Sequence, residues 1–213
     1  MKQFYNKDGK EVLRSMVHGI QENKAFLGDI DGLIGDGDHG MNMNKGFTLF
    51  EERFRDEDIS FAEGLNELGM ILLNEIGGSM GPIYGTIFME AAEAGEDLEA
   101  ISPIELGKML AAGLHGLYDI VEARAGDKTL VDTLSPVVTY LLDENKAEDS
   151  YESILDKMKE IAVTGRDSTK DMVARFGRSA RLGERSKGVL DAGATSCCII
   201  LNAMADGVME VLV

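Results

Sequence analysis

The chain has 213 residues, a hydrophobic content of 44% and a formal net charge of −17, from 38 acidic against 21 basic side chains. So acidic a surface repels phosphate backbones, which argues against nucleic-acid binding. The hydrophobic content suffices for a substantial core, and no Pro-rich or Ser/Gly-rich linker divides the chain, so we expect one domain over residues 1–213.

The N-terminal segment lacks the apolar centre of a signal peptide, and no 18 consecutive apolar residues occur. The adjacent Cys197 and Cys198 cannot bridge each other without strain and lie in an apolar run, so we expect buried free thiols. These features predict a cytoplasmic protein that does not enter a membrane.

Periodicity predicts an all-α protein, because apolar residues recur with helical spacing and no run of β-branched or aromatic residues alternates. Start signals are clearest at Ser60 with Glu63, and at Ser102 with Pro103 and Glu105, which have the pattern of capping boxes. In chain order, about eight helices are expected over residues 10–27, 41–55, 61–76, 82–95, 103–122, 131–145, 150–170 and 193–212.

Glycine is concentrated between these helices in a way that an ordinary helical bundle does not need. One C-capping glycine usually suffices for a helix connection, whereas grouped glycines let backbone pass close to a ligand. Three groups therefore predict one shared site on loops at one end: Gly32, Gly35, Gly37 and Gly40; Gly77, Gly78, Gly81 and Gly85; Gly177, Gly183, Gly188 and Gly193.

The first glycine group carries three carboxylates, Asp31, Asp36 and Asp38, on what reads as a loop. Left alone they repel one another, by roughly 1 kcal/mol per pair at 4 Å in water. A hard divalent cation such as Mg²⁺ removes that repulsion and often shares its shell with phosphates. The alternative is a solvated acidic turn. The Asp-Gly-Asp alternation favours the metal site, and Asp29 is the less suitable ligand.

Two familiar motifs do not fit this segment. Residues 35–40 match G-x-G-x-x-G, but a dinucleotide fingerprint must follow a strand and open a βαβ unit. An EF-hand fails because Gly40 stands at the third ligand position, Met41 at the required glycine and Phe47 at the closing glutamate. A Walker A sequence is absent from the chain.

His39 and Asn42 follow at the expected start of the next helix. Backbone amides there, with the Asn42 side chain, could hold phosphate oxygens. For His39, a phosphate contact and a satisfied turn histidine remain equally open.

Together these segments resemble the nucleotide-binding L subunit of dihydroxyacetone kinase along nearly the whole chain. The resemblance rests on five motifs in one order: IGDGDHGMNMN (34–44), GPIYGT (81–86), GDKT (126–129), GR with GERS (177–186) and DAGATS (191–196). It implies a closed barrel of eight antiparallel helices with ADP or ATP on loops at one end. It also implies that Asp31, Asp36 and Asp38 hold two Mg²⁺ ions. The residues implied around the nucleotide are His39, Asn42, Ser79, Met80, Leu130, Arg178, Asp191 and Gly193.

Some positions depart from the family's pattern. Met80 stands where a small hydroxyl residue is frequent, so Ser79 and the Gly81 amide must supply any hydrogen bond there. Leu130 replaces a methionine and keeps an apolar wall for adenine. Val121 stands where glycine sometimes occurs.

Arg178 lies in the most basic stretch of the chain and is the candidate catalytic residue, because a guanidinium can neutralise charge that develops in phosphoryl transfer. A solvated basic loop is the alternative. The resemblance implies transfer to dihydroxyacetone held on a separate K subunit, with ADP recharged by a phosphohistidine M subunit. Two other functions stay open: a nucleotide-state sensor that binds a transcription regulator, and a kinase subunit for another ketose or a fatty acid.

Overall fold

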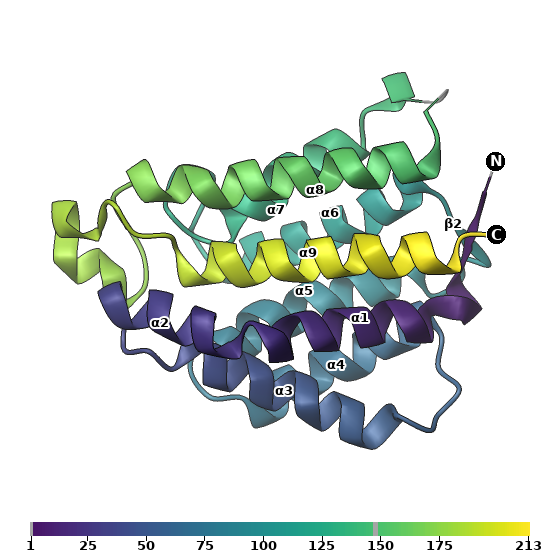
Figure 1. Ribbon diagram of the computed structural model, residues 1–213, viewed down its shortest axis with the longest axis horizontal. Coiled ribbons are helices and arrows are strands. Elements are labelled where there is room, and N and C mark those ends of the chain that lie inside the picture. Colours follow the sequence, from purple (N-terminus) through teal and green to yellow (C-terminus); the bar gives the residue numbers. More distant parts are fainter. Residues whose placement is uncertain (1, 147–148) are drawn as a thin grey trace.

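The computed structural model describes residues 2–146 and 149–213, and helices dominate both ranges. The helices α1, α3, α4, α5, α6, α7, α8 and α9 form a closed ring, in which each packs against the next and α9 returns to α1 (Figure 1). The all-α prediction is confirmed. The helix bounds are α1 (Gly9–Glu22), α2 (Lys24–Ile34), α3 (His39–Phe54), α4 (Phe61–Glu75), α5 (Met80–Gly95), α6 (Pro103–Ile120), α7 (Val131–Leu141), α8 (Tyr151–Ser168) and α9 (Ala192–Val211).

Within the described residues, the apolar stripes of the nine α-helices meet in one continuous core. Both predicted capping boxes are present: Ser60 accepts from the Glu63 amide and Ser102 from the Glu105 amide, while each glutamate accepts from its serine's amide. These caps satisfy amides that a helix start otherwise leaves unpaired. Cys197 and Cys198 are buried and free, as expected.

Helix α9 is the one helix in residues 2–146 and 149–213 that is long and apolar enough to cross a membrane. Its most apolar window is 67% buried inside the fold. That burial is expected of a helix that forms part of a protein core.

Short elements supplement the barrel. The strands β1 (Phe4–Tyr5) and β2 (Ala100–Ile101) pair antiparallel and join the N-terminus to the start of α6. Their two-residue length is too short for an alternating pattern to reveal. The 3₁₀ helices are η1 (Asn6–Asp8), η2 (Glu144–Lys146), η3 (Thr169–Asp171) and η4 (Arg178–Ser186).

The main correction concerns the predicted helix over residues 10–27 and the loop after it. The helix ends at Glu22, and a second helix, α2, continues to Ile34, so Asp31 lies in a helix. This glycine group serves close packing between helices rather than a loop: a Cβ on Gly40, in α3, would lie 2.0 Å from the Lys24 carbonyl oxygen and 2.7 Å from the Gly28 nitrogen, both in α2. The predicted helix over 131–145 is also too long, since α7 ends at Leu141.

Neighbouring helices of the ring alternate in direction, so their connections gather at two ends (Figure 1). Residues 35–38, 76–79, 121–130 and 169–191 connect helices at one end, where α2 also lies. The chain termini and the β1–β2 pair lie at the other end. The fold thereby brings the glycine groups together.

Candidate functional site

A cavity of about 370 Å³ opens at the end where these four connections meet. This is a volume typical of small-molecule sites. Glycines from all three groups line it, namely Gly35, Gly78, Gly177 and Gly193. The expectation that the three groups share one site is therefore confirmed in its geometry.

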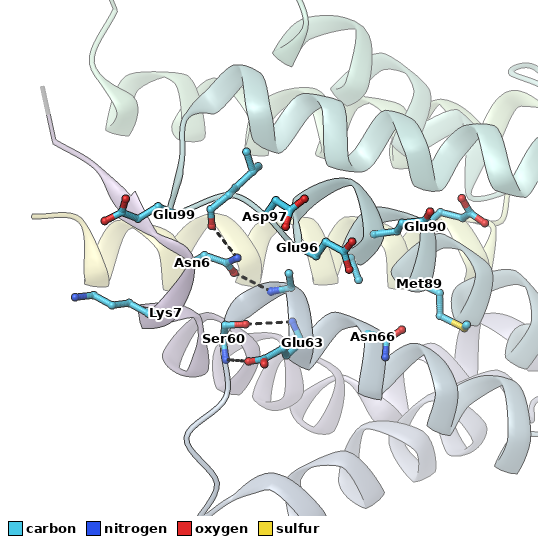
Figure 2. A pocket seen from close by; sticks show the side chains of 14 residues that line it. Asn6, Lys7, Ser60, Glu63, Asn66, Met89, Glu90, Glu96, Asp97 and Glu99 are labelled. Carbon is cyan, nitrogen blue, oxygen red and sulfur yellow. Dashed lines mark hydrogen bonds between the residues drawn. The ribbon is translucent and has the colours of Figure 1, made fainter.

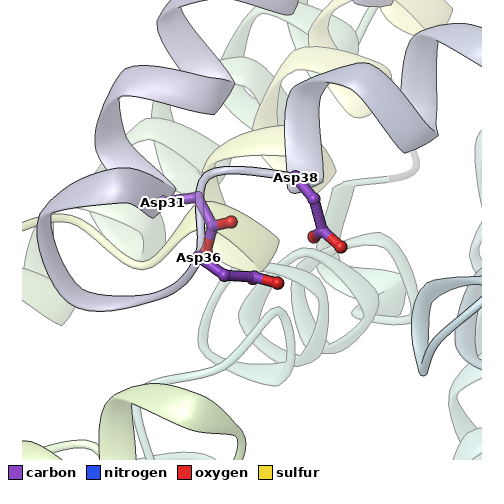
Figure 3. Close-up of side chains that lie close together, drawn as sticks. All are labelled: Asp31, Asp36 and Asp38. Atoms are coloured by element: carbon purple, nitrogen blue, oxygen red, sulfur yellow. The ribbon is translucent and has the colours of Figure 1, made fainter.

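Three carboxylates meet at the rim of this cavity. One oxygen each of Asp31, Asp36 and Asp38 lies within 4.8 Å of the others. Figure 3 shows them coming from the end of α2, the following connection and the start of α3. Burial, followed by the charges of Asp36 and Asp31, raises the pKa of Asp38 above its usual range, and Arg178 and Asn42 partly oppose this. The cluster thus concentrates hard oxygen ligands of the kind that Mg²⁺ prefers.

Close backbone packing holds this cluster in place. The Gly35 amide donates to the Asp31 carbonyl oxygen at 2.5 Å, and a Cβ on Gly35 would lie 2.2 Å from Asp31 Oδ1. Gly37 has a φ of 77°, a conformation that favours glycine. The His39 amide donates to Asp31 Oδ2 at 3.3 Å, which links α2 to the start of α3.

Four helices begin at the cavity. Its lining includes residues at the starts of α3, α5, α7 and α9: His39, Met80, Val131 and Ala192. Helix N-termini carry unpaired amides and partial positive charge, so four of them together favour a bound anion. The acidic rim and the positive helix ends therefore offer adjacent places for a cation and an anion.

Arg178 connects the basic segment to the acidic cluster by an ion pair between its guanidinium and Asp36 Oδ2. Gly177, with a φ of 69°, turns the chain just before it. Two neighbouring basic residues pair with other carboxylates: Arg175 Nη1 lies 3.2 Å from Asp127 Oδ1, and Lys187 pairs with Glu184. Arg178 thus contacts the predicted metal ligands.

His39 belongs to a buried polar chain beneath the cavity. Its Nε2 lies 2.8 Å from Ser196 Oγ, which lies 2.6 Å from the Tyr84 hydroxyl; that hydroxyl also donates to the Gly193 carbonyl at 3.1 Å. Burial lowers the pKa of His39 to about 4, although Asp31 opposes the shift. A neutral imidazole is therefore expected at physiological pH. Sequence reasoning did not single out Tyr84 or Ser196, because only the fold brings them to His39.

Asp191 caps α9 by accepting from the Ala194 amide at 2.8 Å. Burial raises its pKa to about 6, and Lys128 and the Ala194 amide counteract the shift. Lys128 lines the cavity as well, although its side chain was not predicted as a site residue. Its place in GDKT was the one signal available, and burial of a lysine cannot be read from sequence.

The remaining predicted nucleotide-binding residues differ in burial and in their position relative to the cavity. Ser79 is exposed on the rim, whereas Met80 and Leu130 are buried apolar lining residues. Gly193 packs beside Leu130, since a Cβ on it would lie 3.7 Å from the Leu130 Cβ. Asn42 is outside the lining and hydrogen bonds the Asp38 carboxylate.

A second, wider cavity of about 930 Å³ lies at the opposite end of the barrel (Figure 2). Acidic side chains line it, and its buried amide is fully engaged: Asn6 donates to the Gly95 and Leu98 carbonyls and accepts from the Ala62 amide. None of the predicted site residues lies there. We therefore regard its polar groups as structural.

The barrel end described above combines oxygen ligands for a divalent metal with helix N-termini that favour an anion. Residues 33–206 match the DAK2 domain family. The chain is 38% identical to "PEP-dependent dihydroxyacetone kinase 1, ADP-binding subunit DhaL" of Listeria innocua, over 94% of this chain and 96% of the relative. It is 39% identical to the corresponding Escherichia coli K12 subunit, over 84% and 86%. The chain therefore belongs to the DAK2 family, and along most of its length it is similar to ADP-binding subunits of PEP-dependent dihydroxyacetone kinases.

Other relatives are longer than this chain. D-erythrulose kinase of Mycolicibacterium smegmatis is 30% identical over 90% of this chain but only 34% of its own length. The crystal structure of dihydroxyacetone kinase of C. freundii superposes with a TM-score of 0.70 at 20% identity, over 92% of this chain and 33% of that one. That kinase has also been crystallised with AMP-PNP and Mg²⁺. At this identity the superposition shows a shared fold.

Proposed function

We propose that this cavity binds an adenine nucleotide with two Mg²⁺ ions, and that the chain is the nucleotide-carrying subunit of a dihydroxyacetone kinase. The observation that carries the proposal is the cluster of Asp31, Asp36 and Asp38 beside four helix N-termini. Its placement in a chain related to ADP-binding subunits supports the same assignment.

The three carboxylates fit a divalent metal on chemical grounds. They offer only oxygen ligands, carry more negative charge than Arg178 alone balances, and leave the pKa of Asp38 raised. Bound Mg²⁺ would neutralise phosphate charge and polarise the transferred phosphoryl group. Each carboxylate has two oxygens, so Asp31, Asp36 and Asp38 would be able to hold more than one ion, which supports the proposed pair.

The rest of the lining suits the parts of a nucleotide. Ser79 and His39, which line the cavity at the starts of α5 and α3, would contact phosphate oxygens, and Asn42 would orient Asp38, to which it hydrogen bonds. Leu130 and Met80 provide an apolar surface for the base. Asp191 and Gly193 lie next to Leu130 at the start of α9, where they would contact the nucleotide beside that surface.

Phosphoryl transfer depends mainly on positioning and charge neutralisation, so a protein nucleophile is not required. In the proposed reaction, the bond between the terminal phosphorus of ATP and its bridging oxygen breaks and ADP leaves, while a new bond forms to a substrate hydroxyl oxygen, whose proton is released to solvent. Arg178 is proposed to balance the charge that develops on the transferred group. Its ion pair with Asp36 holds the guanidinium at the cluster before nucleotide binds.

The acceptor is proposed to be dihydroxyacetone on a separate K subunit, and a phosphohistidine M subunit is proposed to recharge the ADP. D-erythrulose kinase, which is named for another acceptor, matches this chain over only 34% of its own length, so acceptor choice is assigned to the part of that relative that lies outside the match. Exposed apolar side chains support docking of a partner at the cavity: Leu33 lies between Asp31 and Asp36 in the sequence, Met41 follows Asp38, and Phe176 lines the cavity. The continuous core supports a single domain, and the buried free thiols suit the cytoplasm.

Calorimetric titration of the purified chain with ADP and Mg²⁺ tests nucleotide binding. We expect Asp36→Asn and Arg178→Ala each to weaken Mg–ADP binding by at least about tenfold, the loss of one charge-assisted contact. Asp29→Asn is the matched control, because Asp29 is an exposed carboxylate on α2, the helix that carries Asp31, and lies outside the cluster. Equal affinity of Asp36→Asn and wild type would refute the metal-bridged site.

Activity is tested by mixing the chain with a K subunit, phosphorylated M subunit and dihydroxyacetone. Formation of triose phosphate only when all components are present is the expected result. Mg–ADP binding without turnover would instead favour a nucleotide-state sensor that binds a transcription regulator. Turnover of another ketose or a fatty acid with ATP would favour the third candidate.

A further inference from the structure

We propose that Lys128 is a positioning residue, whose ammonium clips together the two ends of the segment between α8 and α9 and so fixes Arg178 at the acidic cluster. The clip itself is independent of ligand. Its consequence for binding rests on the proposed function, because only a nucleotide gives the location of Arg178 a role.

The clip is visible in the hydrogen bonds of Lys128. Its Nζ donates to the Thr169 carbonyl and to the Val189 carbonyl, both at 2.6 Å. These acceptors stand at the first turn and near the last residue of the connecting segment, 20 positions apart in sequence. Lys128 is 1% exposed, and among the lysines whose burial the structure describes it alone is buried.

Two further hydrogen bonds join the two ends of this segment, which together we call its base. The Gly188 amide donates to the Lys170 carbonyl at 2.8 Å, and the Asp191 amide donates to Thr169 Oγ1 at 3.0 Å. An ammonium carries several donors on one atom and can therefore serve both carbonyls. An apolar side chain at 128 would leave both carbonyls without this partner in a buried place, which is costly.

Beyond its base, the segment holds its own shape. The buried Ser186 accepts from the Ala174 amide at 2.9 Å and donates to the Gly183 carbonyl at 2.7 Å. Arg175 anchors the segment to Asp127, the residue before Lys128. The Arg175 amide donates to the Asp127 carbonyl, and the Arg175 guanidinium pairs with the Asp127 carboxylate. A segment tied internally and fixed at its base places Arg178 as one unit.

The backbone of Lys128 is itself constrained. Its φ of 61° is left-handed, and no other non-glycine residue of the described ranges has a positive φ. Two carboxylates enforce the turn: Asp127 accepts from the Arg124 amide and Asp132 from the Thr129 amide, both at 2.8 Å. Strained residues persist where the surrounding structure demands them, often at functional sites.

The charge of Lys128 also has a place in this arrangement. Burial lowers its pKa, while Asp191 and Asp171 oppose the shift. The ammonium therefore faces carboxylates on both sides of the segment that it clips. Its positive charge supports the Asp191 cap at the start of α9.

Hydrogen exchange without nucleotide tests the clip. In Lys128→Met we expect the amides of Gly188 and Asp191 to exchange about tenfold faster, with amides of α4 and α5 unchanged. Lys187→Met is the matched control, since Lys187 is an exposed lysine of the same segment, and it should behave as wild type. Should Lys128→Met fail to fold, Lys128→Gln replaces it, because the shorter amide keeps a donor yet does not carry the charge. Unchanged protection in the folded variant would overturn the clip.

A double-mutant cycle on Mg–ADP affinity tests the positioning role. If Lys128 acts through Arg178, Lys128→Met should weaken binding by about tenfold in the wild-type background and by less than about twofold in Arg178→Ala. Additive losses would identify a merely structural lysine and overturn the positioning role. If the wild type itself binds no Mg–ADP, the proposed function fails, while hydrogen exchange still decides whether the clip exists.

Discussion

Neutralising one carboxylate of the acidic cluster should have opposite effects on stability without and with ligand. In Asp38→Asn, two repulsions of about 1 kcal/mol each are removed, since the oxygens of Asp31 and Asp36 lie within 4.8 Å. The attractions of Asp38 to Arg178 and to the N-terminus of α3 are lost too, which cancels about half of the gain. The ligand-free variant should therefore be more stable by about 1 kcal/mol, or roughly 2–4 °C in melting temperature.

Adding Mg²⁺ and ADP should reverse this order. At a ligand concentration of about 100 times Kd, binding stabilises the wild type by about 2.7 kcal/mol, and the variant should lose most of that gain. Thermal denaturation at matched ionic strength, with NaCl replacing MgCl₂ in the reference samples, separates binding from screening. A less stable ligand-free variant would refute the repulsion argument. An equal response to Mg²⁺ and ADP would refute the assignment of Asp38 as a metal ligand.

Three further predictions concern residues around the cavity. Because the pKa of Asp191 is raised to about 6, the native state binds its proton more tightly than the unfolded chain, and wild-type stability should fall as pH rises from about 4 through 6. In chemical denaturation, the free energy of unfolding of Asp191→Asn should therefore equal that of the wild type near pH 4 and exceed it at pH 8 by up to about 3 kcal/mol. The difference is smaller if solvent reaches the carboxylate. A difference that does not change with pH would contradict this prediction. Ser196→Ala leaves the buried His39 Nε2 without its partner and should cost about 1–3 kcal/mol by the same measurement, and a loss below about 0.5 kcal/mol would count against the buried chain. Gly40→Ala should lower the stability measured by thermal denaturation by about 3 kcal/mol or more, because the new Cβ would meet the backbone of α2. A Cβ on Gly77 would meet nothing within 4 Å, so the control Gly77→Ala should change stability by no more than about 0.5 kcal/mol. Equal effects of the two variants would refute close packing of α2 on α3.

Much of the barrel could be predicted from local pattern. The capping boxes at Ser60 and Ser102 lie where the sequence predicts them, because a capping box involves residues only three positions apart. Helix α2 was missed for the opposite reason. The glycines of α2 predict a loop when only the local sequence is considered. Their contacts with Gly37 and Gly40 in the folded chain show instead that they allow a neighbouring backbone to approach closely.

The candidate site divides in the same way. Asp31, Asp36 and Asp38 could be selected from the sequence, because they are close along the chain and their spacing implies that their charges meet. Tyr84, Ser196 and Lys128 could not, since each acts on a residue far away in sequence: Ser196 on His39, and Lys128 on Thr169 and Val189. The sequence by itself determined which chemical groups are present and where helices begin. The tertiary structure alone decided which groups are buried and paired, because burial and hydrogen bonding at these positions arise when distant helices pack together.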